Sequence, residues 1–287
     1  MNKKVIAIAI VLVVAILIGV YIQARPEPET LVIVFSPAPG IDPATAKAAY
    51  GAIAAELEQK LGVKVVMKTT TDYAATTAAL ENGEADIARL GGEPLIQAYD
   101  NFGVEPLVRE INPNGIAEYH GILIAKPGVF EEPFTWEQLK GRSVAFPDVG
   151  STSGYLSNLA NMQNNGIYLE DLGEYGFAGS HPLVFEAVLS GAVDVGGTND
   201  WRTALACEKG GYKEGVDFVI LATSPPIPMN AWAVRGDMPE KKKEAIREAL
   251  LSISQEAFDQ CEQVKGFVPA SIEDYDYIRD LMELTSD

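Results

Sequence analysis

The chain has 287 residues, of which 47% are hydrophobic and 22% charged, so it is a globular protein long enough for two domains. Its formal net charge of -18 argues against nucleic acid or an anionic membrane surface as a partner. Two histidines and two cysteines are too few for a structural zinc site, and we expect neither a metal nor another cofactor. Cys207 and Cys261 are equally compatible with one disulfide and with two thiols.

The N-terminal segment has the pattern of an export signal. Lys3 and Lys4 precede an uncharged apolar run at 5–22, and a polar, proline-containing linker follows at 26–30. The run is nearly long enough to span a bilayer, and neither an Ala-x-Ala cleavage site nor a lipid-accepting cysteine follows it. We therefore assign residues 1–25 to an uncleaved anchor with its lysines in the cytoplasm, or alternatively to a cleaved signal peptide. In both cases the rest of the chain is expected to work outside the cytoplasm.

Strands and helices alternate along the first part of the exported chain. Apolar runs predict strands, and alanine-rich runs that end at glycine predict helices. The expected elements are a strand at 31–35, a helix at 43–61 stopped by Gly62, a strand at 63–67, a helix from 71 to about 80, and a third strand led by 86–88. This alternation is typical of α/β folds with largely parallel sheets, whose ligands lie beyond the carboxyl ends of the strands.

The second part of the chain continues the same alternation. Tyr119 and His120 come just before a predicted strand at 122–125. The further expected elements are a short helix at 135–140, a strand at 143–146, helices from 151 to about 161 and at 182–189, strands at 191–197 and 215–222, a crossover at 224–228, a helix from 240 to about 261 and a last helix from 271.

One short pattern occurs twice in the chain. Gly83 and Gly191 each end a predicted helix, and each is followed at the same spacing by an aspartate, Asp86 or Asp194, that leads into a strand. We interpret the repeat as a sign of two similar α/β domains that present strand ends to a shared cleft.

The most informative stretch is Ser151-Thr152-Ser153, between Gly150 and Gly154. These hydroxyls fall where a strand turns into a helix, and a helix N-terminus exposes unpaired N–H groups and partial positive charge. A single hydroxyl there would be interpreted as a helix cap, but consecutive hydroxyls between glycines favour an anion site. No lysine follows the second glycine, so a Walker-type nucleotide loop is excluded.

On these residues, the chain from Leu31 to its C-terminal helix resembles the extracytoplasmic phosphonate- and phosphite-binding proteins of ABC transporters. The most specific matches are the segments 72–73, 83–88, 151–154 and 179–181. The resemblance implies an α/β, two-lobed fold of the type II periplasmic-binding-protein kind, in which each lobe is a mostly parallel sheet flanked by helices. Lobe 1 is then expected at 31–119 and 225–287 and lobe 2 at 120–224, with the ligand in the cleft between them.

The resemblance also implies the ligand-binding residues. Those that hold the phosphorus oxyanion are expected to be Tyr73, Tyr119, Ser151, Thr152, Ser153 and His181. Two further positions match sites where the family uses acidic residues, Asp200 and Asn230, and at the second of these an amide replaces the acid. The residues alone leave purely structural interpretations open: Tyr73 as a core residue, Asp200 as a helix cap and His120 as a strand residue without a ligand role.

The expected function is therefore that of a monomeric solute-binding protein, which captures a small phosphorus oxyanion by hinge closure and delivers it to an ABC transporter permease. A carboxylate at Asp200 suits a ligand that brings an ammonium, as an aminophosphonate does, or a P–OH group, as protonated phosphate or phosphite does. Because Asn230 leaves only this one acid, a phosphonate is favoured only slightly over phosphite or phosphate. The role of Glu93 stays open. A hydrolase built on Ser151 and His181 is disfavoured, because the Gly-x-Ser-x-Gly elbow is missing. A sensor lobe of a membrane receptor is the third alternative.

Overall fold

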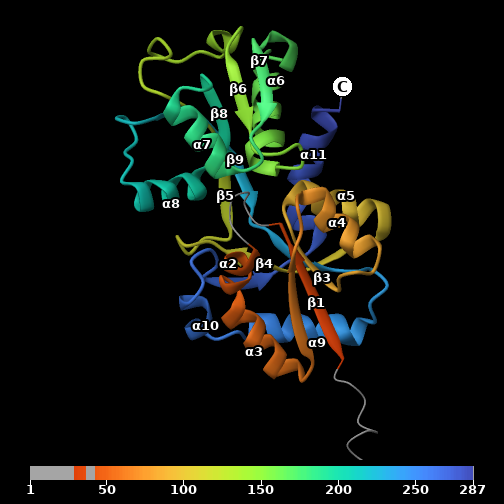
Figure 1. The fold of residues 1–287 in the computed structure, drawn as a ribbon. Helices are drawn as coiled ribbons and strands as arrows, with labels where there is room; N and C mark the ends of the chain where they lie inside the picture. The colour runs from red at the N-terminus through yellow and green to blue at the C-terminus, as the bar shows by residue number, and fades with distance from the viewer. Residues whose placement is uncertain (1–28, 37–42, 287) are drawn as a thin grey trace, which may run out of the picture.

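Two β-sheets, one in each of two lobes, organise the computed structural model, which describes residues 29–36 and 43–286 (Figure 1). The sheet of lobe 1 has the strand order β11-β4-β10-β3-β1-β2. Its strands are β1 (Thr30–Phe35), β2 (Lys64–Thr69), β3 (Ile87–Leu90), β4 (Glu105–Ile111), β10 (Ala231–Val234) and β11 (Gly266–Pro269).

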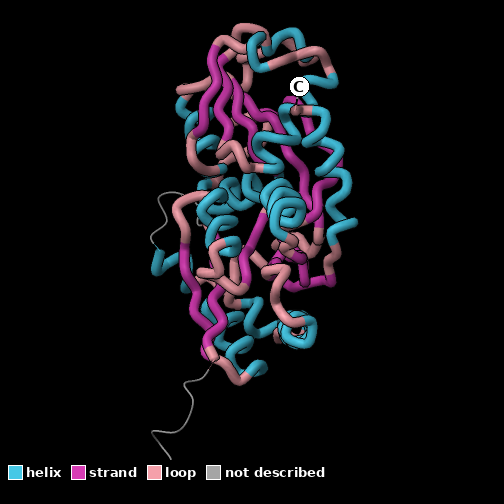
Figure 2. The backbone as a smooth tube through the Cα atoms, turned by 90° about the vertical axis from the view of Figure 1, so that its right-hand side faces the viewer, coloured by secondary structure: helices cyan, strands magenta, loops and turns pink. Residues whose placement is uncertain are grey.

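The sheet of lobe 2 has the order β7-β6-β8-β5-β9. Its strands are β5 (Glu118–Ala125), β6 (Ser143–Phe146), β7 (Glu174–Phe177), β8 (Val195–Asn199) and β9 (Val219–Pro228). Strands β5 and β9 pair antiparallel from Glu118–Pro228 to Ala125–Val219, and they carry the chain from one lobe to the other and back. The two lobes lie end to end in both ribbon views (Figures 1 and 2).

Both sheets are mixed, whereas the sequence predicted mostly parallel sheets. The pairs β1–β2, β1–β3, β6–β7 and β6–β8 are parallel. Strands β5, β9, β10 and β11 all pair antiparallel with their neighbours. The prediction was wrong for these strands because periodicity identifies a buried strand and not its direction in the sheet.

Helices cover both faces of each sheet. In lobe 1 they are α2 (Pro43–Ala48), α3 (Gly51–Leu61), α4 (Tyr73–Glu81), α5 (Gly92–Phe102), α9 (Glu240–Leu251), α10 (Gln255–Asp259), the short η4 (Ile272–Tyr275) and α11 (Asp276–Leu284). In lobe 2 they are the short η1 (Trp136–Leu139), η2 (Thr152–Leu156) and η3 (Leu169–Asp171), with α6 (Ser157–Asn164), α7 (His181–Ser190) and α8 (Asp200–Gly210). Buried apolar side chains fill the space between sheets and helices on each side, which is the usual core of an α/β fold.

The repeated glycine–aspartate pattern has the same role in both lobes. Gly83 and Gly191 follow their helices with φ of 71° and 76°. Asp86 Oδ2 accepts the backbone N–H of Val32 at 2.8 Å, and Asp194 Oδ2 accepts that of Ser143 at 3.0 Å. In each lobe the aspartate before one strand thus caps the start of the neighbouring parallel strand. The pattern therefore reflects a shared local structure in two similar sheets.

Two long predicted helices are each divided in two. The helix expected at 43–61 is interrupted at Ala49 and Tyr50, where the Tyr50 ring packs edge-on against Phe35 and Trp232. The helix expected from 240 to about 261 ends at Leu251, and Ser254 caps a new helix by accepting the N–H of Ala257. In both cases a core contact or a cap overrides helix propensity.

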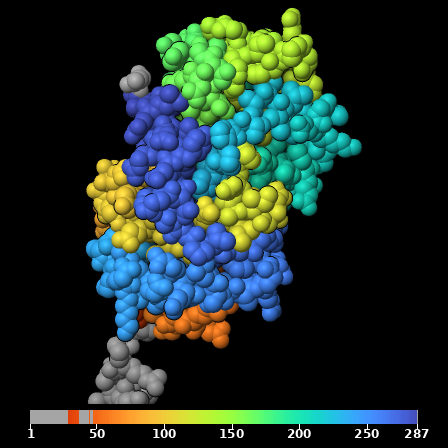
Figure 3. Space-filling model, turned by 180° about the vertical axis from the view of Figure 1, so that it is seen from behind, coloured from red at the N-terminus to blue at the C-terminus, as the bar shows by residue number. Residues whose placement is uncertain are grey.

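The C-terminal helix α11 joins the two lobes. It packs against α5 of lobe 1 and against η2 and α6 of lobe 2, and Figure 3 shows this segment lying across the back of the molecule. None of the helices in the described ranges is long and apolar enough to cross a membrane. The predicted anchor at residues 1–25 lies outside the described residues.

Candidate ligand-binding site

The Ser-Thr-Ser segment forms a turn that aims hydroxyl groups into the space between the lobes. A π-helical turn, η2, leads from Ser151 into α6, so the helix start is wider than an α-helical one. Gly154 packs against Pro147, and a Cβ there would lie 2.3 Å from Pro147 Cγ. The glycine thus permits the tight return of the chain, whereas Gly150 lines the cavity itself.

The hydroxyl oxygens of this turn already accept protein hydrogen bonds. Ser151 Oγ accepts the N–H of Gly154 at 3.1 Å, and Ser153 Oγ accepts Asn199 Nδ2 at 3.3 Å. Thr152 Oγ1 accepts the N–H of Glu93 at 2.8 Å and so links lobe 2 to lobe 1. With these acceptor positions used, the hydroxyl hydrogens are available as donors to an anion.

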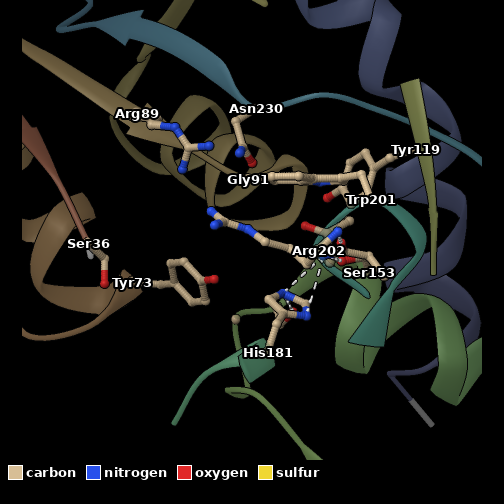
Figure 4. Close-up of a pocket in the computed structure, with 14 residues that line it drawn as sticks. Ser36, Tyr73, Arg89, Gly91, Tyr119, Ser153, His181, Trp201, Arg202 and Asn230 are labelled. Atoms are coloured by element: carbon tan, nitrogen blue, oxygen red, sulfur yellow. Dashed lines mark hydrogen bonds between the residues drawn. The ribbon is translucent and has the colours of Figure 1, made fainter. Parts of the chain in front are cut away.

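The turn borders a cavity of about 50 Å³ that both lobes line (Figure 4). Its lining comprises Ser36, Tyr73, Arg89, Gly91, Tyr119, Gly150, Ser151, Thr152, Ser153, His181, Asn199, Trp201, Arg202 and Asn230. A second cavity of about 150 Å³ lies beside it and shares Ser36, Tyr73, Arg89, His181 and Arg202. Of the predicted ligand-binding residues, the structure brings all except Asp200 to the first cavity.

His181 begins α7 and faces the turn. Its Nε2 lies 3.5 Å from Ser151 Oγ, its Nδ1 lies 3.1 Å from Thr198 Oγ1, and Asn199 Nδ2 approaches the ring at 3.3 Å. Burial and the charge of Arg202 lower the pKa of His181 to about 3, so the ring is neutral at neutral pH. Because the partner of Nδ1 is a hydroxyl and not a carboxylate, the arrangement lacks the third member of a hydrolase triad.

The tyrosines approach the cavity from different sides. Tyr73 is the first residue of α4, behind the cap Asp72, and Tyr119 lies within β5 rather than before it. Both tyrosines line the cavity that the Ser-Thr-Ser turn borders. Burial raises the pKa of both phenols, so they are neutral donors at neutral pH.

Arg89 and Asn230 form the lobe 1 wall of the cavity. Arg89 makes a bidentate pair with Glu110, in which Nε–Oε1 is 2.6 Å and Nη2–Oε2 is 2.8 Å. Glu110 is fully buried and also accepts Trp232 Nε1 at 3.0 Å. Hydrogen-bond chemistry orients the Asn230 amide so that its oxygen accepts Arg89 Nη1 at 3.2 Å. Asn230 therefore helps to hold Arg89 in place.

Arg202 extends from α8 into the middle of the cavity, where Figure 4 shows its guanidinium between Arg89 and the Tyr73 hydroxyl. Its Nη2 donates to Gln263 Oε1 at 3.0 Å, and its Cζ lies 4.1 Å from the centre of the Trp201 ring. A guanidinium is always charged and matches the geometry of phosphoryl oxygens. Arg202 is thus a cation suited to an oxyanion.

Asp200 and His120 do not line either cavity. Asp200 Oδ1 accepts the backbone N–H groups of His120 at 3.1 Å and Trp201 at 2.7 Å, so it stabilises the start of α8. His120 Nδ1 pairs with the carbonyl of Ser224 at 2.8 Å. The cap of α8 is Asn199, whose Oδ1 accepts the N–H of Arg202 at 2.9 Å, and Asp200 is the first residue of the helix.

Sequence reasoning missed the arginines, together with Ser36, Asn199 and Trp201. A positional signal for them existed. Arg89 lies near the end of a predicted strand, and Arg202 follows the strand predicted at 191–197 by a few residues. These are places where an α/β sheet binds ligands, so a cation there is a candidate anion partner.

Glu93 lies in a groove between the lobes, next to the cavity, with Tyr73, Glu81 and Asp148 among the other lining residues. Burial, followed by the charge of Asp148, raises the pKa of Glu93 from the model-compound 4.5 to about 7. Opening of the lobes would expose the carboxyl group and return its pKa toward the ordinary value of 4.5, because burial is the main cause of the shift. The closed state thus holds this proton more tightly than the open state, so closure is favoured below pH 4.5 and the advantage is lost as pH rises through 7.

We therefore expect Glu93→Gln to alter the pH dependence of ligand binding. Relative to this variant, wild-type affinity should fall between about pH 5 and pH 8, whatever the ionisation of the ligand itself, because the ligand is the same in both titrations. Calorimetry across this pH range measures the ratio of the wild-type affinity to the affinity of the variant. Glu81→Gln, on the exposed edge of the same groove, is the matched control and should leave the ratio flat. A constant ratio for Glu93→Gln would show that Glu93 does not titrate with closure.

The two cysteines do not form a disulfide in this structure. Cys207 lies in α8 and Cys261 is buried in lobe 1, and both are free thiols. Within the described residues, no group of three or more histidine, cysteine, aspartate or glutamate side chains is placed to hold a metal ion.

Comparison with known proteins agrees with this geometry. The family profile of the ABC transporter, phosphonate, periplasmic substrate-binding protein matches residues 35–275. The phosphate-import protein PhnD of Mycolicibacterium smegmatis is 27% identical, over 88% of this chain and 85% of the relative. Two solved structures share the fold, each at 18% identity and a TM-score of 0.77. One is a binding protein component of an ABC phosphonate transporter from Pseudomonas aeruginosa, and the match covers 90% of this chain and 87% of that chain. The other is PhnD1 from Prochlorococcus marinus in complex with methylphosphonate, and the match covers 90% of this chain and 98% of that chain.

Proposed function

Because the chain belongs to the periplasmic substrate-binding proteins of phosphonate ABC transporters, we propose that it captures a small phosphorus oxyanion between its lobes and delivers it to the permease of an importer. Proteins of this family bind a substrate outside the cytoplasm and do not convert it. The observation that carries the proposal is the cavity between the lobes, in which Ser151, Thr152 and Ser153 of lobe 2 offer hydroxyl donors opposite Tyr73 and Arg89 of lobe 1.

A phosphonate fits this cavity through its tetrahedral oxygens, and a second cavity beside it leaves room for a substituent on phosphorus. The methylphosphonate in the Prochlorococcus relative supports this ligand class. Phosphate is the alternative, because the mycobacterial relative is a phosphate-import protein and the hydroxyl donors suit either ion. Both ligands require the same group of donors.

Ligand binding between lobes gives a mechanism of closure. An oxyanion that bonds to Tyr73 and Arg89 on one side and to the Ser-Thr-Ser turn and His181 on the other stabilises the closed arrangement. Thr152, whose hydroxyl accepts the N–H of Glu93, already links the lobes in this arrangement. We further propose that the domain works as a monomer, with lobes at 31–119 plus 225–287 and 120–224, and that residues 1–25 tether it to the outer face of the membrane.

Three measurements on the exported domain, from about residue 27 onward, test this proposal. Calorimetry should show binding of methylphosphonate or phosphate, while phosphorus magnetic resonance of the mixture should show no new product. Small-angle scattering should show a smaller radius of gyration at saturation, because closure brings the lobes together. Steady release of a product, or the absence of binding to methylphosphonate, phosphite and phosphate alike, would contradict the proposed function.

A further inference from the structure

The cavity between the lobes is lined by positive charge without negative charge. Arg89 and Arg202 line it, and none of the described residues that line it is an aspartate or a glutamate. His181 is neutral and Asp200 points to the start of α8 instead. An occupant of the cavity therefore meets guanidinium groups and neutral donors only.

The two guanidinium groups differ in how their charge is balanced. The charge of Arg89 is compensated by the bidentate pair with buried Glu110. Arg202 has only neutral partners among the described residues, namely the Gln263 amide and the Trp201 ring. Burial, followed by the charge of Arg89, lowers the pKa of Arg202. Arg202 therefore supplies the net charge of the cavity.

The second cavity determines what a substituent on phosphorus meets. Both cavities share Arg89 and Arg202, so a substituent that extends from one into the other passes the two guanidinium groups. Two carboxylates line the second cavity, and both cap their own turns: Asp72 Oδ1 accepts the N–H of Ala75 at 2.7 Å, and Asp148 Oδ1 accepts that of Gly150 at 2.8 Å. Each carboxylate thus has one oxygen engaged within its own turn, whereas the hydrogen-bond and ring partners of Arg202 among the described residues are neutral.

We propose that Arg202 makes this site selective for phosphorus oxyanions that carry no cationic group, so that alkylphosphonates and inorganic oxyanions bind and aminoalkylphosphonates are rejected. This inference rests on the proposed function and specifies its ligand. Like charges in a partly buried site repel strongly, whereas the guanidinium fork donates well to phosphoryl oxygens. The sequence-based expectation was that Asp200 binds an ammonium group of the ligand. In this proposal the site instead selects against ligands that carry such a group.

The test uses two ligands that differ only in an ammonium in place of a methyl group, aminomethylphosphonate and ethylphosphonate. Calorimetry with the wild-type domain at neutral pH should show ethylphosphonate binding at least about ten-fold more tightly. Arg202→Gln should weaken ethylphosphonate binding and bring the two affinities closer together. Arg202→Lys keeps the charge and should retain the preference. Lys209→Gln removes an exposed cation from the same helix and should leave the ratio unchanged.

The outcomes separate this inference from the proposed function. Equal affinities in the wild type, tighter binding of aminomethylphosphonate, or a preference that persists in Arg202→Gln would overturn the selectivity. So would failure of both ligands to bind when methylphosphonate does, because the second cavity must leave room for the substituent. If Asp148→Asn specifically weakens aminomethylphosphonate, that carboxylate is its counter-ion and the inference fails. Absence of binding to every phosphorus oxyanion would instead overturn the proposed function.

Discussion

Replacement of Ser151, Thr152 and Ser153 together by alanine is expected to weaken methylphosphonate binding by at least about three orders of magnitude. Each hydroxyl offers its hydrogen to the ligand, because its oxygen already accepts a protein N–H. A hydrogen bond to a charged group contributes about 1.5–3 kcal/mol, so the loss of three amounts to at least about 4.5 kcal/mol. Calorimetry of the triple variant measures this loss.

The fold should survive this change. Ser151 is the only cap among these residues, and loss of such a cap costs about 1 kcal/mol of stability. Ser157→Ala is the matched control, because its buried hydroxyl lies in the same segment, donates to the Ser153 carbonyl at 2.9 Å and does not line the cavity. It should leave affinity within a few-fold of wild type. Undiminished binding by the triple variant would place the anion elsewhere.

Replacement of Glu110 by leucine is expected to lower the free energy of unfolding by about 3–5 kcal/mol. The substitution leaves the Arg89 guanidinium without its buried counter-ion and deprives Trp232 Nε1 of its acceptor. An uncompensated buried charge costs far more than the pair itself contributes. Urea denaturation followed by circular dichroism measures the difference.

Two comparisons identify the cause of that loss. The double variant Arg89→Met with Glu110→Leu removes both charges and should recover most of the stability, although ligand affinity should fall because Arg89 lines the cavity. Glu262→Leu breaks an exposed ion pair with Lys209, where the side chains are 58% and 70% exposed, and should cost less than about 1 kcal/mol. If the double variant is as unstable as Glu110→Leu alone, packing and not charge explains the effect.

Much of the fold could be predicted from local sequence patterns, because these patterns reflect local physics. The glycine stops after α3 and α7, the cap Asp72 before α4 and the repeated aspartates all act within a few residues or between neighbouring strands. The direction of β5, β9, β10 and β11 and the break at Tyr50 depend on contacts between distant segments. Periodicity contains no information on such contacts.

The same distinction applies to the site. Consecutive hydroxyls at one turn are visible in the sequence, and the structure places Ser151, Thr152 and Ser153 on the cavity. The roles of Arg202 and Asp200 depend on side-chain direction. They are two residues apart on α8, but Arg202 enters the cavity and Asp200 accepts backbone N–H groups at the start of the helix. Spacing along the chain does not reveal which of two polar side chains near a helix start faces a ligand.

The most direct measurement is a crystal structure of the exported domain with methylphosphonate bound. The account predicts a phosphoryl group in the cavity between the lobes, with its oxygens about 2.5–3.0 Å from the hydroxyls of Ser151, Thr152 and Ser153 and with Arg202 donating to it. Phosphorus found outside this cavity, or within it but beyond hydrogen-bond reach of all three hydroxyls, would contradict the account.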